Sequence, residues 1–293
     1  MKRKLNIAFI GIVLLVSSCI SKEAKSVLDC AETLIADHPD SALVLLEKLD
    51  KEELDTRKAE AEYRLLHIMA SDAVSSRMSG VPFLEDEETI SSVAGYYSSS
   101  RNREKRMLSQ YYLGRVQFRN RKYNNAVISF TKALDEAESL DDQHYIGLIN
   151  KNLAHTCKAS FNSRDALSYM KRAFKAFELS GDKDEKNRAF LETGKLYYDL
   201  EEYNQANRVL KSALILAKSE RNPRLEAEAL EAYSALELAK SNRQPELAVK
   251  MLQRVQNDLG CTLSPEAKGL MAYALALSGS QQEAKDWLEK AEM

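Results

Sequence analysis

Apolar positions recur along most of the chain every three or four residues, which is the spacing of amphipathic α-helices. Residues 111–134 (YYLGRVQFRNRKYNNAVISFTKAL) show this pattern on both sides of a polar corner. After the corner, Ala126, Phe130 and Ala133 stand at i, i+4 and i+7, so they share one helical face. The segment therefore predicts two helices joined by a short turn.

This helix pair repeats along the chain. The small mid-helix residues Gly114, Ala154 and Gly194 are forty residues apart (154 − 114 = 40 and 194 − 154 = 40). Each is followed by a small-large-small set on the second helix: Ala126/Phe130/Ala133, Ala166/Met170/Ala173 and Ala206/Leu210/Ala213. Looser copies follow around Ser234 and Ala272. Because each pair leaves apolar surface that only a neighbouring pair can cover, the repeats predict a stack of helical hairpins.

The residue types at these repeated positions, together with Tyr123 and Tyr203 near the turns, resemble the tetratricopeptide repeat in a longer form of about forty residues. The match departs from that family where an aromatic residue often opens the first helix. Gln110 and Asn150 stand there, and only Phe190 complies. The resemblance implies an all-α solenoid, a right-handed superhelix of about seven helical hairpins whose first helices line a concave groove.

The pattern divides the chain into four parts. We expect a signal peptide at 1–18, degenerate N-terminal hairpins at 19–106, three well-matched units at 107–220 and two looser units at 221–293. The individual hairpins are expected at 22–50, 56–100, 107–140, 146–180, 186–220, 224–258 and 264–293.

The N-terminus begins with the cationic stretch MKRK, continues with the apolar run LNIAFIGIVLLV and ends in VSSC. This order is typical of a signal peptide, and the apolar run is shorter than the roughly 20 residues of an ordinary spanning helix. Residues 16–19 resemble a bacterial lipobox, which implies a lipid on Cys19 and a chain anchored in the cell envelope. By the same resemblance, Ile20 favours the outer membrane. An uncleaved anchor and a generic secretory signal are the alternatives.

Composition and charge favour a helical protein and argue against a nucleic-acid partner. The 293 residues are 44% apolar and 29% charged, with ten Gly and five Pro, which favours helix throughout. The formal net charge is −2, and removal of residues 1–18 takes away three cations and leaves 39 − 44 = −5. No basic field therefore indicates a nucleic-acid partner. Cys30, Cys157 and Cys261 have no regular spacing and do not form a disulfide framework.

The residues indicate no catalytic, cofactor or metal site. The chain lacks a phosphate-binding loop, a dinucleotide fingerprint, an HExxH helix and a GxSxG elbow. Its four histidines have no Cys or carboxylate partners at metal-ligand spacing on a shared helical face. We therefore expect a binding protein without a cofactor rather than an enzyme.

In the resembled family, the first helix of each hairpin lines the groove. Counting from the small mid-helix residue gives ten candidate partner-binding residues: Tyr111, Arg115, Phe118, Arg119, Lys151, His155, Lys158, Arg188, Lys195 and Tyr198. Their basic and aromatic character favours an acidic peptide segment or a free carboxyl terminus as the occupant. The alternative interpretation is a solvated face whose lysine stems cover apolar surface.

The sequence thus favours an adaptor or scaffold lipoprotein that binds a protein or peptide partner at the membrane. A periplasmic sensor module for a small ligand or a signalling partner is the alternative. Trp287 on the last helix either packs back on the preceding unit or marks a C-terminal edge that forms a homodimer.

Overall fold

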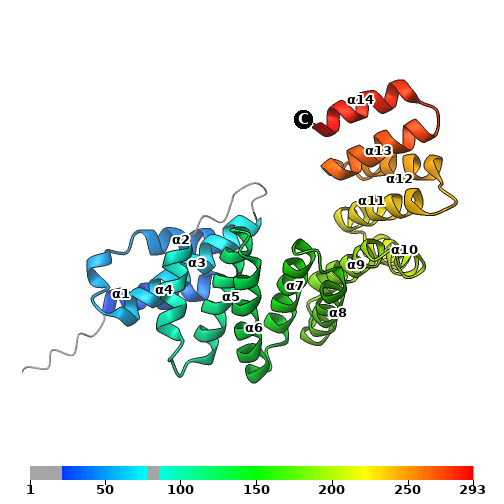
Figure 1. Ribbon diagram of the computed structural model, residues 1–293. Helices are drawn as coiled ribbons and strands as arrows, with labels where there is room; N and C mark the ends of the chain where they lie inside the picture. Colours follow the sequence, from blue (N-terminus) through cyan, green and yellow to red (C-terminus); the bar gives the residue numbers. More distant parts are fainter. Residues whose placement is uncertain (1–21, 78–85, 293) are drawn as a thin grey trace, which may run out of the picture. The chain divides into compact units, whose positions relative to one another are not determined.

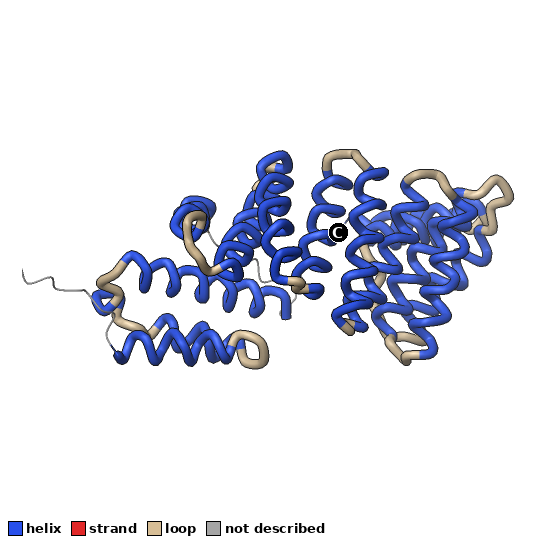
Figure 2. The backbone as a smooth tube through the Cα atoms, turned by 90° about the horizontal axis from the view of Figure 1, so that it is seen from below, coloured by secondary structure: helices blue, strands red, loops and turns tan. Residues whose placement is uncertain are grey.

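The computed structural model describes residues 22–77 and 86–292, and all the regular structure within these ranges is helical (Figures 1 and 2). The predicted signal peptide, Cys19 and Ile20 lie outside the described residues. The chain forms two compact units, residues 1–99 and 100–293. The next helix begins after Asn102, whose side chain accepts a hydrogen bond from the Lys105 amide.

The first unit contains two helix pairs. Its helices are α1 (Lys22–Leu34), α2 (Pro39–Glu47), α3 (Arg57–Arg77) and α4 (Glu87–Tyr97), with a short 3-10 turn at Lys51–Glu53. Ala42, Leu46 and Leu49, which share a face, are all buried. They pack with Leu28 and Leu66 from the neighbouring helices, so α1, α2 and α3 enclose one core.

The second unit is a row of five hairpins. Its helices are α5 (Arg103–Arg119), α6 (Tyr123–Leu140), α7 (Gln143–Ala159), α8 (Ser163–Ser180), α9 (Lys183–Asp199), α10 (Tyr203–Ser219), α11 (Pro223–Ala239), α12 (Pro245–Asn257), α13 (Pro265–Leu277) and α14 (Gln281–Glu292). Each helix packs mainly against its neighbours in sequence, and first helices of adjacent hairpins also touch (Figure 1). The forty-residue repeat therefore corresponds to stacked hairpins.

Helix starts in the second unit repeat as regularly as its core. The first helix of every hairpin begins after a side chain that accepts a hydrogen bond from an amide three residues on: Asn102, Asp142, Asp182, Asn222 and Ser264. Such a cap satisfies an amide that has no partner within the helix and contributes about 1 kcal/mol. The caps fix where each hairpin begins.

The two helices of a hairpin approach closely at the small residues that define the repeat. Gly114 faces the ring of Phe130, and an added Cβ would lie 2.7 Å from two ring carbons. Gly194 faces Leu210 in the same way, at 2.6 Å. Gly147, which the repeat pattern does not single out, faces Phe177 at 2.5 Å. In each of these three hairpins a large side chain thus fills the space beside a glycine.

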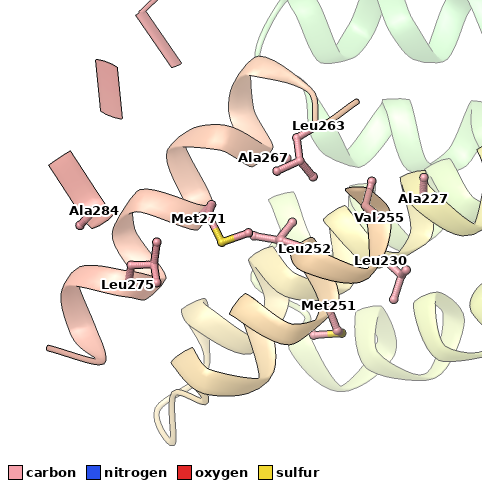
Figure 3. Close-up of a cluster of buried hydrophobic side chains, with 10 residues drawn as sticks. All are labelled: Ala227, Leu230, Met251, Leu252, Val255, Leu263, Ala267, Met271, Leu275 and Ala284. Carbon is pink, nitrogen blue, oxygen red and sulfur yellow. The ribbon is translucent and has the colours of Figure 1, made fainter. Parts of the chain in front are cut away.

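The last two hairpins share a cluster of buried apolar side chains (Figure 3). Leu252 of α12 lies beside Met271 of α13, and Val255 and Leu275 belong to the same cluster. Trp287 packs against this cluster, as expected if the final helix closes the preceding unit, and Lys290 lies 4.4 Å from its ring centre.

We predict that Gly114→Ala destabilises the protein by about 1–3 kcal/mol, because the new methyl group would overlap the buried Phe130 ring. This loss exceeds the gain of up to about 1 kcal/mol from better helix propensity. Gly269→Ala is the matched control, because a Cβ there meets no atom within 4 Å and should stabilise α13 by about 0.5–1 kcal/mol. Chemical denaturation of both variants measures the free energy of unfolding, and equal effects would contradict the close-packing argument.

Candidate functional site

The candidate site consists of partly or fully exposed side chains on the first helices of three adjacent hairpins. We call this set the first-helix face: Arg115, Phe118 and Arg119 of α5; Lys151, His155 and Lys158 of α7; and Arg188, Lys195 and Tyr198 of α9. The structure leaves nine of the ten predicted residues accessible there. The tenth, Tyr111, is only 4% exposed.

Tyr111 is part of the packing between hairpins. Its ring meets Tyr145 of α7 edge-on, with ring centres 5.7 Å apart, and also contacts Phe130. The guanidinium of Arg115 lies 5.8 Å from the centre of the same ring. Tyr111 therefore supports the first-helix face from beneath, because the neighbouring hairpin covers the position that the sequence pattern assigns to the surface.

Lysines of the first-helix face are paired with carboxylates. Lys151 Nζ lies 2.6 Å from Glu185, and Lys158 Nζ lies 2.7 Å from Asp199, so two ion pairs join α7 to α9. Within α9, Lys195 pairs with Glu192 at 2.7 Å. Partly exposed pairs of this kind contribute about 0–1 kcal/mol, so they orient side chains more than they stabilise the fold. The face therefore carries charges of both signs.

His155 and Glu192 face each other between these pairs. Burial lowers the pKa of His155 below its ordinary value, Lys151 and Lys158 lower it further, and Glu192 and Glu185 oppose the shift. Burial alone would raise the pKa of Glu192, but nearby cations, chiefly Lys195, lower it overall. At neutral pH the centre of the face thus holds an uncharged imidazole beside a carboxylate.

Two aromatic pairs stand at equivalent places in the repeat. Phe118 contacts Tyr123 across the α5–α6 turn, with ring centres 5.8 Å apart, and Tyr198 contacts Tyr203 across the α9–α10 turn at 6.1 Å. Burial, with smaller effects from Tyr203 and Asp199, raises the pKa of Tyr198, so its hydroxyl stays protonated. Each pair offers a partly exposed aromatic surface at the end of a first helix.

The sequence pattern missed two of the carboxylates that pair with the lysines. The groove positions were counted at fixed offsets from the small mid-helix residue, and Glu185 and Glu192 fall outside those offsets, whereas Asp199 falls on one. Glu185 lies 34 residues after Lys151, six short of the forty-residue repeat, so counting by repeats does not point to it. Asp199 lies 41 residues after Lys158 (199 − 158 = 41), so a search for acidic residues about one repeat after each basic one finds that pair.

Neither metal ligands nor a spanning helix occur in the described ranges. No group of three or more His, Cys, Asp or Glu side chains there is placed to hold a metal ion. None of the helices within 22–77 and 86–292 is long and apolar enough to cross a membrane.

No known family's sequence profile matches the chain, and no curated protein sequence matches it. Several solved structures have a similar fold. The apo form of RapI has a TM-score of 0.69 at 14% identity, over 92% of this chain and 75% of that chain. NprR, in complex with its cognate peptide NprX, has a TM-score of 0.65 at 16% identity, over 93% and 79%. A signal-transduction ATPase with a tetratricopeptide repeat sensor, from Pyrococcus horikoshii, has 0.61 at 18%, over 92% and 41%. These likenesses show the fold, which is a tetratricopeptide-like solenoid.

We predict that the protein loses stability as the pH falls through the folded-state pKa of His155. Because this pKa lies below that of the unfolded chain, the unfolded chain binds more protons between the two values, and stability rises with pH in that window. Melting curves from about pH 7.5 to about pH 5 stay above the range in which Glu192 titrates.

His155→Gln should flatten this dependence of the melting temperature on pH. His38→Gln is the control, because His38 is exposed and lies in the first unit. An unchanged pH slope in His155→Gln would contradict the assignment.

Proposed function

We propose that the protein is an adaptor that binds a segment of another protein on the first-helix face and is held at the membrane by a lipid on Cys19. The observation that carries the proposal is this face itself. It presents oriented charges and aromatic edges from three consecutive helices, on a fold built by stacking. The peptide bound to NprR, a structure of similar fold, supports a peptide segment as the occupant.

The charges of the first-helix face indicate which chemical groups a partner would carry. Lys151, Lys158 and Lys195 are already compensated by carboxylates, so they select for the spacing of charges rather than for net acidity. The arginines of α5 and α9 add cations to this set, and Arg188 is exposed. We propose a segment with a carboxylate for Arg188 and apolar side chains for the aromatic edges at Phe118 and Tyr198. A contact of this size binds near the micromolar range, about −8 kcal/mol.

Membrane attachment is the second part of the proposal. Two or more acyl chains on a modified Cys19 hold a soluble domain durably, at about 0.8 kcal/mol per buried methylene. The tether would place the hairpins in the cell envelope, at the outer membrane. A sensor for a small ligand is the second candidate function, and a separate polar cavity in the second unit favours it.

We expect a photo-crosslinking residue at position 188 to form adducts with the partner protein or peptide in native membranes. The same residue at position 208 is the control, because Arg208 is equally a surface arginine but lies on α10, a second helix. Once mass spectrometry has identified the partner, Arg188→Glu should weaken the binding of that partner tenfold or more, about 1.4 kcal/mol. The same substitution should make the affinity less dependent on salt concentration. Binding that survives Arg188→Glu but not Arg208→Glu would place the site on the second helices instead.

We expect Cys19→Ala to move the protein from the membrane fraction to the soluble fraction. Mass spectrometry of the wild type should find acyl chains on Cys19 at the mature N-terminus. Cys30→Ala, which changes an exposed cysteine of α1, should leave fractionation unchanged. An unmodified Cys19, or membrane retention of Cys19→Ala, would exclude the lipid tether and leave peptide binding untouched.

A further inference from the structure

The second unit contains a surface cavity of about 670 Å³, widely open to solvent, at the edge where its hairpins turn. The α9–α10 turn and the start of α10 form one wall, and the α11–α12 turn forms the other. Its lining consists of amide, carboxylate, hydroxyl and ammonium groups around the ring of Tyr203, with no aliphatic side chain among them. The volume lies within the roughly 300–1,000 Å³ that is typical of small-ligand sites.

The cavity exists because the repeat is broken here in two ways. The other four hairpins of the unit turn over three residues, for example 120–122, whereas α11 and α12 are joined by the longer loop 240–244. In addition, Asn207 of α10 occupies the position of Leu167 in α8 and Val127 in α6, forty and eighty residues earlier (207 − 167 = 40 and 207 − 127 = 80). A longer loop and a polar side chain thus coincide at one place.

Asn207 is held in a defined orientation. Its side-chain oxygen accepts hydrogen bonds from the Tyr233 hydroxyl at 3.0 Å and from Lys240 Nζ at 3.2 Å. Because an ammonium group can only donate, the oxygen must be the atom that faces Lys240. The Asn207 amide nitrogen has no hydrogen-bond partner within the described part of the chain, so it remains a donor for a ligand in the cavity. Lys240 also pairs with Glu237, which balances its charge.

The rest of the lining offers donors and acceptors side by side. Asn204, Gln205 and Asn242 carry amides that each donate and accept, and no partner for these amides occurs within the described residues. Glu201 and Glu202 add acceptors and a negative charge, which disfavours phosphate or another anion. The lack of aliphatic walls disfavours a lipid or an apolar ligand. The lining therefore favours a ligand that is neither anionic nor apolar. A neutral ligand that is rich in hydroxyl groups fits, because each hydroxyl donates and accepts.

We propose that this cavity binds a neutral saccharide. Neighbouring hydroxyls of a sugar ring match the paired donor and acceptor of an amide, and carboxylates accept from further hydroxyls. Tyr203, which Tyr198 contacts at a ring-centre distance of 6.1 Å, supplies a flat surface for the C–H face of the sugar. This inference does not rest on peptide binding at the first-helix face.

The test is titration of the full chain with defined neutral oligosaccharides: maltopentaose, cellopentaose, mannopentaose, xylopentaose and chitopentaose. Saturation-transfer NMR detects binding, and calorimetry measures the affinity. We expect at least one of them to bind, and Asn204→Leu and Asn207→Leu each to weaken that binding tenfold or more. Asn204 is exposed, so its variant keeps the test valid even if Asn207→Leu unfolds the protein.

Asn124→Leu is the matched control. Asn124 follows Tyr123 at the start of α6 as Asn204 follows Tyr203 at the start of α10, and both asparagines are exposed. The control should bind the oligosaccharide as the wild type does. Failure of all five oligosaccharides to bind would overturn the proposal. Binding that is unaffected by Asn204→Leu, or that is lost equally in Asn124→Leu, would overturn it as well.

Discussion

Close contact between a small residue on one helix and a large one on the next is the constraint on which the second unit depends. Gly114 lies against Phe130, Gly147 against Phe177 and Gly194 against Leu210, with no room for a further methyl group. This contact brings the two helices of these three hairpins close together, and a pair of helices cannot bury its apolar surface alone and must stack on its neighbours. The row of hairpins, and every surface formed across it, follows from that requirement.

Stacking determines the character of the first-helix face. It brings α7 beside α9, so that Lys151 and Lys158 meet carboxylates of the next hairpin. It also places Tyr111 beneath Tyr145 and removes it from the surface. The face therefore carries a pattern of both charges rather than a uniformly basic surface. For the proposed binding of a peptide, such a pattern would discriminate by the positions of charges, because a wrongly placed like charge costs several kcal/mol.

The cavity beside Asn207 arises where the repeat fails. Repeat proteins keep the same residue types at equivalent positions, so a position that departs from the pattern is a candidate functional site. Here the longer α11–α12 loop and the replacement of an apolar residue by Asn207 occur together, and Lys240 and Tyr233 hold the asparagine in place. One scaffold thus presents two adjoining surfaces, one along its first helices and one at its turns, which meet at the contact between Tyr198 and Tyr203.

The all-helical repeat and the buried residues that recur in it could be read from the residues alone. Each depends on local periodicity and on a spacing of forty residues, both of which are visible in one dimension. The pairing of Lys151 with Glu185, the burial of Tyr111 and the cavity at Lys240 could not. These features join residues more than thirty positions apart on adjacent hairpins, such as the 34 that separate Lys151 from Glu185. Their geometry depends on how one hairpin is rotated against the next, which only the packed tertiary structure sets.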